Sequence, residues 1–192
     1  DDPTLGFRLE GSLYLMQVRD LQLTRFVSTG AGRIVGNAGG SRSLGVEFSA
    51  SKRLLGSLSA QATYSLTDAR FTEETGRAKK GYVVPFIPQH TFSGMLSFNE
   101  HVGGKFRLFG EAECMGFGRI YWTEDNSTSE PLQTNLRARL GVAYDRLSLA
   151  LWGNNLADRS YTIFSAASPM PNGAMVQTSA PRSLGIDLSV RL

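Results

Sequence analysis

The sequence predicts an all-β fold: an antiparallel up-and-down transmembrane β-barrel segment of about eight strands, with long extracellular loops and short periplasmic turns. Three observations carry this prediction. Polar and apolar residues alternate with a period of two in eight windows, the connections between windows alternate in length, and the polar faces carry many charges. With 21 glycines and 7 prolines in 192 residues, we expect strands and turns and almost no helix.

Each window places apolar residues on one face and small or polar residues on the other. In the last window the even positions from Leu184 to Leu192 are apolar and the odd positions are small or polar. Phe109 alone interrupts its window on the polar face. In chain order the windows are Leu5–Leu15, Ser43–Ala50, Ser57–Leu66, Thr91–Phe98, Lys105–Cys114, Leu132–Tyr144, Leu147–Leu151 and Arg182–Leu192.

The connections between the windows are alternately long and short. Long ones run roughly over 17–40, 70–89, 119–131 and 156–180, and short ones over 51–56, 99–104 and 145–146. In a meander every second connection lies at the same end, so all long loops share one rim and both chain ends lie at the other. Transmembrane barrels have this asymmetry, whereas Greek-key sandwiches are not expected to sort their loops.

The polar faces decide between a membrane barrel and a soluble one, because a soluble barrel also has one apolar face, turned inward. Arg, Glu, Asp and Gln on these faces would need paired partners in a soluble core, whereas a polar lumen accommodates them. Facing residues must share a face. If the hairpin after Cys114 is symmetric about Asp125, Glu113 faces Arg137 and Glu111 faces Arg139, which predicts lumenal ion pairs.

Several other classes are disfavoured. No stretch reaches the roughly eighteen consecutive apolar residues of a spanning helix. The net charge of +3, with scattered Lys and Arg, argues against a nucleic-acid partner. One cysteine, Cys114, excludes an internal disulfide, and with two histidines it favours no metal site; we predict no cofactor. No catalytic triad or phosphate-binding loop is present, so we do not expect an enzyme.

Four segments resemble TonB-dependent outer-membrane receptors, and they occur in the order typical of that family. They are Asn37-Ala38-Gly39 followed by Leu44-Gly45-Val46-Glu47, the run Tyr64–Phe71, the proline-flanked run Val84–Phe92, and Trp152–Tyr161 with its Asn-Leu-x-Asp-x-x-Tyr element before the closing strand. Together they span residues 37–192. The resemblance implies a location in the Gram-negative cell outer membrane, in contact with its lipid.

The resemblance also implies a function. The intact receptor would bind a scarce small-molecule nutrient, such as a ferric siderophore, in its outer loops and import it with energy delivered through TonB. Residues 1–192 are interpreted as the C-terminal β-barrel portion, because no signal peptide or plug domain precedes the strands and the family has more than eight. Contact with TonB would run through the missing plug, so we expect this chain alone not to transport.

Two other functions stay open from the sequence. One is a stand-alone small outer-membrane barrel with a structural or adhesive role. If the eight strands closed on themselves, side chains would just fill the interior. The other is a soluble carrier of apolar ligands, which would be monomeric without detergent. Upstream sequence encoding a plug separates the receptor from the small barrel.

Candidate site residues fall into two groups. Glu111 and Glu113 are paired carboxylates of the kind used in acid–base chemistry, but in a polar lumen we interpret them as partners of arginines. Among the aromatic residues near strand ends, Tyr121, Trp122, Tyr161 and Phe164 could form a ligand-facing surface on the outer rim. The alternative is an interfacial aromatic girdle formed by Phe71, Tyr82, Phe86, Phe117, Tyr121, Trp122, Tyr161 and Phe164.

Overall fold

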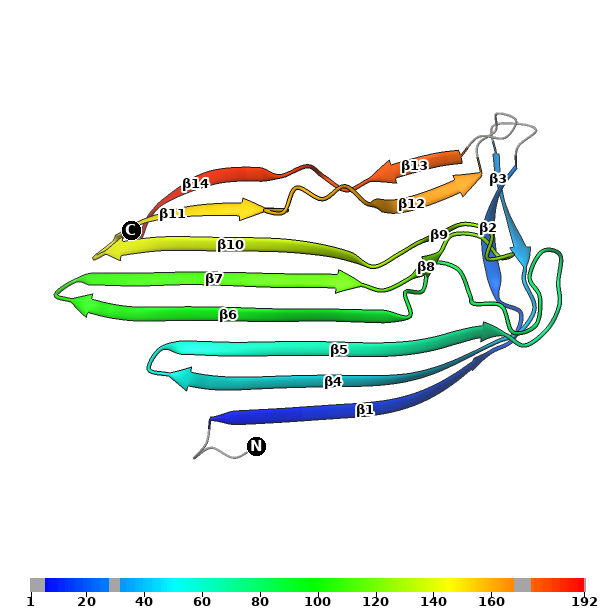
Figure 1. Ribbon diagram of the computed structural model, residues 1–192, viewed down its shortest axis with the longest axis horizontal. Coiled ribbons are helices and arrows are strands. Elements are labelled where there is room, and N and C mark those ends of the chain that lie inside the picture. Colours follow the sequence, from blue (N-terminus) through cyan, green and yellow to red (C-terminus); the bar gives the residue numbers. More distant parts are fainter. Residues whose placement is uncertain (1–5, 28–31, 168–173, 192) are drawn as a thin grey trace.

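The structure is a computed structural model that describes residues 6–27, 32–167 and 174–191. Within these residues, eight antiparallel strands form one sheet whose spatial order follows the chain order (Figure 1). The fold is therefore the predicted up-and-down meander. Its strands are β1 (Phe7–Val18), β4 (Ser41–Leu55), β5 (Leu58–Phe71), β6 (His90–Gly103), β7 (Phe106–Phe117), β10 (Gln133–Tyr144), β11 (Leu147–Asn154) and β14 (Ser183–Val190). Leu5 and Leu192, at the ends of two predicted windows, lie outside the described residues.

The connections are sorted by length as predicted, with the long ones at one end of the sheet and the short turns at the other (Figure 1). We call these the outer end and the inner end. Three long connections, expected as loops, instead carry hairpins: β2 (Gln22–Val27) with β3 (Gly32–Asn37), β8 (Ile120–Tyr121) with β9 (Ser129–Glu130), and β12 (Thr162–Ala167) with β13 (Ala174–Thr178). These strands are at most six residues long, too short to show a clear alternation.

The inner turns are tight because a few residues adopt a left-handed backbone. Gly56 has a φ of 51° between β4 and β5, and Asp145 has a φ of 53° between β10 and β11. Aspartate is one of the few residues with a side chain that tolerates this region. The Asp145 carboxylate also pairs with Lys105, with 3.0 Å between Oδ2 and Nζ, so two neighbouring turns are linked at the inner end.

The two faces of the sheet differ in chemistry as predicted. The register places Leu140, Leu151 and Ile186 side by side on one face, which we call the apolar face. These side chains are exposed, and Leu188 next to them is 72% exposed. An exposed apolar surface of this extent suits contact with lipid. In the described part of the chain, no helix is long and apolar enough to cross a membrane.

Among the described residues, five glycines are covered by the ring of an aromatic residue directly opposite on the neighbouring strand. A Cβ atom added to Gly141 would lie 2.3 Å from Cζ of Phe109, so the ring occupies the space above the glycine. This explains why Phe109 interrupts the polar alternation: its ring covers a position without a side chain. The five aromatic–glycine pairs are Tyr14–Gly45, Phe92–Gly116, Phe98–Gly110, Phe109–Gly141 and Trp152–Gly185.

A compact hydrophobic core lies at the outer end of β4 and β5, not within the sheet. Phe71 is 1% exposed and packs with Ala38, Ala69 and Val84, which come from β5 and from the connections on either side of the β4–β5 hairpin. The segment after β5 folds back along it, because Val84 N donates to Ala69 O over 3.0 Å. The girdle interpretation is therefore wrong for Phe71, whose ring is covered by protein.

Candidate functional site

Three aromatic side chains from three different connections meet at the outer end. Phe86 comes from the segment between β5 and β6, Trp122 follows β8, and Phe164 lies in β12. The ring centroids of Phe86 and Phe164 are 6.0 Å apart and nearly parallel, and Trp122 lies 5.8 Å from Phe86 and 6.5 Å from Phe164. We call these three residues the aromatic cluster. Pairs at such distances contribute about 0.5–1.5 kcal/mol each beyond their buried area.

The backbone holds Phe86 in the aromatic cluster at an energetic cost. Phe86 has a φ of 65°, a left-handed conformation that costs a residue with a side chain about 1–2 kcal/mol. Its N–H donates to the carbonyl of Tyr121 over 2.9 Å, and the N–H of Trp122 donates to Thr128 over 2.9 Å. The two segments that carry Phe86 and Trp122 are therefore joined directly. Strain of this kind is typical of functional sites.

Trp122 supplies the polar group of the aromatic cluster. The residue is only 7% exposed, yet its indole Nε1 has no hydrogen-bond partner among the described residues. A buried donor without a partner costs about 1–3 kcal/mol, and an acceptor that reached it would remove that cost. The cluster thus combines apolar ring faces with one directional N–H donor, the pairing typical of small-molecule sites.

The other two predicted ligand-facing residues lie near the aromatic cluster but not in it. The ring of Tyr161 packs edge-on against Phe117, with 6.5 Å between the centroids. Tyr121 contributes its carbonyl to the bond with Phe86 and pairs with Ser129 in the β8–β9 hairpin. The sequence predicts Phe86 only as a member of the girdle. Its position between Pro85 and Pro88 in a long connection was the signal that could have singled it out.

The β8–β9 hairpin is fastened to the neighbouring connection by Asn126. Its side-chain Oδ1 accepts from Val83 N and its Nδ2 donates to Val83 O, both over 2.8 Å, so the amide imitates a strand partner. Next to it, the hydroxyl of Ser127 donates to Asp125, and this bond holds the pKa of the Asp125 carboxyl below its ordinary value. These bonds fix the hairpin that carries Trp122.

Replacing Asn126 with aspartate should release this hairpin. The carboxylate would face the carbonyl of Val83 in place of a donor, at a cost of about 1–3 kcal/mol for the lost bond and the new repulsion. We expect faster hydrogen exchange at the Val83 amide. The matched control is Asn99→Asp, since Asn99 is exposed and lies toward the inner end of β6. Equal hydrogen-exchange rates at the Val83 amide in Asn126→Asp and in the unmodified protein would show that Asn126 does not hold the hairpin in place.

The predicted lumenal charges lie on the polar face in the expected register, with Glu113 opposite Arg137 and Glu111 opposite Arg139. Glu113 and Arg137 form an ion pair. Arg139 instead reaches Asp187 on β14, with 3.0 Å between Nη2 and Oδ2, and Glu111 forms no ion pair within the described residues. The guanidinium is long enough to pass over the single strand between β10 and β14, and it finds a carboxylate there.

Metal and acid–base chemistry find no support in the geometry. Within the described residues, no group of three or more His, Cys, Asp or Glu side chains could hold a metal ion. Nδ1 of His90 lies 2.7 Å from the hydroxyl of Tyr64 on the neighbouring strand, so this histidine has a structural partner at the start of β6. Glu113 is engaged with Arg137.

Comparison with known proteins agrees with the fold. Residues 2–156 match the model of the family described as TonB dependent receptor-like, beta-barrel. The chain belongs to the TonB-dependent receptor family. The barrels of these receptors are outer-membrane proteins and the family consists of transporters, so the predicted location and the absence of an enzymatic role are confirmed. For this receptor barrel, the outer end is the extracellular one.

Solved structures show the same fold. The ferric yersiniabactin uptake receptor FyuA from Yersinia pestis aligns with a TM-score of 0.82 and 21% identity, over 96% of this chain and 27% of that one. The siderophore receptor PiuA from Acinetobacter baumannii aligns with a TM-score of 0.70 and 17% identity, over 96% and 26%. The ferric citrate transporter FecA aligns with a TM-score of 0.72 and 20% identity, over 99% and 29%. The receptor barrel described here spans less than a third of each.

Proposed function

We propose that residues 1–192 are the C-terminal barrel portion of an outer-membrane receptor that takes up a scarce nutrient such as a ferric siderophore. The aromatic cluster is the observation that carries this proposal. It gathers Phe86, Trp122 and Phe164 from three connections at the extracellular end, around an indole N–H that has no partner among the described residues. Of the proteins that share the fold, FyuA is a ferric yersiniabactin uptake receptor and PiuA is a siderophore receptor.

The open edges of the sheet support a larger barrel over the stand-alone alternative. β1 and β14 lie at opposite edges, each hydrogen-bonded to one neighbour only within the described residues. Unpaired backbone groups cost several kcal/mol each in lipid, so each edge requires a partner strand, and β1 and β14 do not pair with each other in the described sheet. We infer that the remaining strands and a plug belong to the same receptor. Energy from TonB would reach the barrel through that plug, and this chain alone would not transport.

Binding of ferric yersiniabactin and ferric citrate to the intact receptor tests the role of the aromatic cluster. Trp122→Phe keeps the ring and removes the N–H donor, and we expect affinity for the bound chelate to fall roughly tenfold, as for one lost hydrogen bond. Phe164→Ala removes a wall of the cluster and should have a similar effect. Intrinsic fluorescence quenching or calorimetry measures both.

The matched control is Phe106→Ala. Phe106 packs against Tyr144 with 4.5 Å between the ring centroids, so the change removes an aromatic pair of the same kind at the inner end. Affinity should then stay unchanged. If Trp122→Phe and Phe164→Ala both bind as tightly as the unmodified receptor, the aromatic cluster is not the binding site. If neither chelate binds the unmodified receptor, the proposed siderophore class is wrong.

A further inference from the structure

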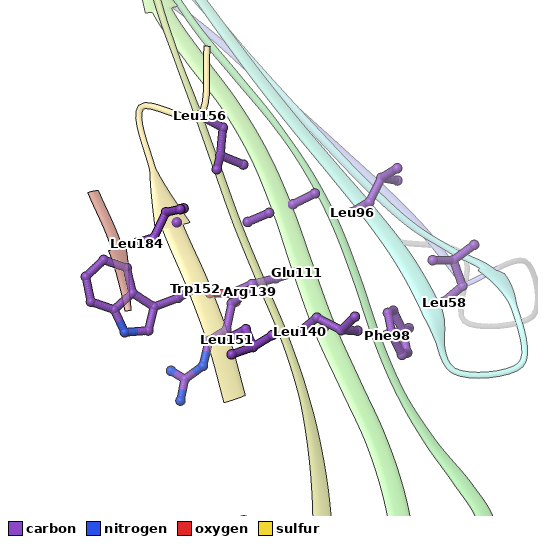
Figure 2. A pocket seen from close by; sticks show the side chains of 14 residues that line it. Leu58, Leu96, Phe98, Glu111, Arg139, Leu140, Leu151, Trp152, Leu156 and Leu184 are labelled. Carbon is purple, nitrogen blue, oxygen red and sulfur yellow. The ribbon is translucent and has the colours of Figure 1, made fainter. Parts of the chain in front are cut away.

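The apolar face carries a hollow of about 510 Å³ where β7, β10 and β11 lie side by side (Figure 2). Its floor consists of small residues that face one another across the strands: Gly110, Ala112, Ala138 and Gly153. Most residues of the apolar face have long side chains. The four small residues have short side chains or none, so the surface is hollowed at their positions. The volume falls within the range of small-molecule sites, about 300–1,000 Å³.

The walls of the hollow are mostly apolar, although Glu111 and Arg139 also contribute to its lining. Leu156 and Leu184 stand on one side, and Leu96 and Phe98 stand on the other (Figure 2). Leu156 is fixed in place, because its N–H donates to the carbonyl of Leu136 over 2.9 Å. The hollow is continuous with the surface that the outer membrane covers, so an apolar part of a membrane lipid is the molecule available to fill it.

Two arginines lie above the hollow toward the outer end. Arg159 Nη1 donates over 3.2 Å to the hydroxyl of Thr134, which shares the apolar face of β10 with Ala138. Arg182 precedes β14 by one residue and is two positions above Leu184. At about 3.3 Å per residue, Thr134 is about 13 Å above the floor at Ala138. That spacing fits a headgroup at the rim with its chain extending down into the hollow.

The charges at this rim favour an anion. The guanidinium of Arg159 has no acidic partner within the described residues. The backbone N–H of Arg182 donates to Asp158 Oδ1 over 3.1 Å, but its guanidinium is only loosely paired, with 3.7 Å between Nη2 and Oδ2. The backbone of Arg159 is also fixed, because its N–H and carbonyl both bond to the side chain of the buried Asn155. Guanidinium groups bind phosphate oxygens with strong charge-assisted hydrogen bonds.

We propose that this part of the barrel binds a phosphorylated lipid of the outer leaflet, with its phosphate on Arg159 and Arg182 and one acyl chain in the hollow. The site lies on the outside of the barrel, separate from the aromatic cluster. It would fasten β10, β11 and β14 to the lipid that surrounds them. The proposal requires the outer-membrane location but not any particular nutrient.

Native mass spectrometry of the intact protein, released from detergent micelles after titration with lipid A, tests the proposal. We expect retained lipid A adducts with the unmodified protein and roughly tenfold weaker retention for Arg159→Gln combined with Arg182→Gln, as for lost charge-assisted bonds. Ala138→Leu fills the floor of the hollow and should also weaken retention. Dephosphorylated lipid A should bind more weakly than lipid A to the unmodified protein.

Matched controls separate this site from general contact with lipid. Arg42→Gln removes an exposed arginine at the outer end of β4, and Ala62→Leu enlarges an exposed alanine on the apolar side of β5. Both should retain lipid A as the unmodified protein does. Unchanged retention in the double arginine variant, or equal binding of dephosphorylated lipid A, would overturn the phosphate site. Unchanged retention in Ala138→Leu would overturn the occupied hollow. Nutrient binding is read separately, so neither result bears on the proposed receptor function.

Discussion

Replacing Asn155 with alanine should lower the free energy of unfolding by about 2–4 kcal/mol, because it removes three hydrogen bonds between a buried side chain and the backbone. Asn155 is 2% exposed. Its Oδ1 accepts from Arg159 N over 3.0 Å, and its Nδ2 donates to Arg159 O over 2.9 Å and to Ala180 O over 3.0 Å. The side chain therefore joins the start and the end of the long connection between β11 and β14.

The backbone of Asn155 adds to the expected loss. Its φ of 48° lies in the left-handed region, which asparagine tolerates better than alanine does. Asn155→Asp should destabilise at least as much as alanine, because a carboxylate would face the carbonyls of Arg159 and Ala180. Urea unfolding of the intact protein in detergent measures both. The β12–β13 hairpin carries Phe164, so nutrient affinity should fall with stability.

Asn154→Ala is the matched control for this prediction. Asn154 is the exposed neighbour of Asn155, and its replacement should change stability by less than about 0.5 kcal/mol. Wild-type stability in Asn155→Asp would show that the three bonds do not hold the connection together.

Replacing Gly185 with valine should destabilise the protein by about 1–3 kcal/mol through overpacking. A Cβ atom on Gly185 would lie 2.3 Å from Cζ2 of Trp152, so the indole would have to move. The same ring donates from Nε1 to Oδ1 of Asp187 over 3.1 Å, and Asp187 holds Arg139. Movement of one ring would thus break a hydrogen bond and disturb an ion pair across β10, β11 and β14.

A second substitution distinguishes overpacking from a general effect of valine. Trp152→Ala in the Gly185→Val background removes the colliding ring, so the two changes together should cost less than the sum of their separate effects. Ser189→Val introduces the same side chain four residues further along the same face of β14 and should be nearly neutral. Additive costs in the double variant would contradict the contact between ring and backbone.

The strands were predictable because polar and apolar residues alternate along each of them. The window from Leu132 to Tyr144 became β10, and the parity of facing residues gave the register between Glu113 and Arg137. The strand ends were less predictable. β5 continues to Phe71, five residues beyond the window that ended at Leu66, because the following segment folds back and pairs with it.

The contacts at the outer end could not be predicted from the chain alone. Phe86, Trp122 and Phe164 come from three connections, and their meeting depends on how each hairpin is fastened. Asn126 and Asn155 hold the hairpins in place through side-chain hydrogen bonds to distant backbone groups. No periodicity in the sequence predicts such bonds. The partner of Arg139 was missed for a related reason: sequence parity fixes the face, but the reach of a long side chain fixes the partner.

The meander order of the sheet has a consequence for how the barrel assembles. Every sheet strand pairs only with the strands before and after it in the meander, so no pairing waits for a distant part of the chain. Closing each contact requires only the one connection between two consecutive sheet strands, and topologies dominated by such local contacts form quickly because less chain entropy is lost before pairing begins. Each completed hairpin also exposes an edge on which the next can form. The barrel wall can therefore be built by adding one hairpin at a time, and the membrane can cover each new apolar face as it forms.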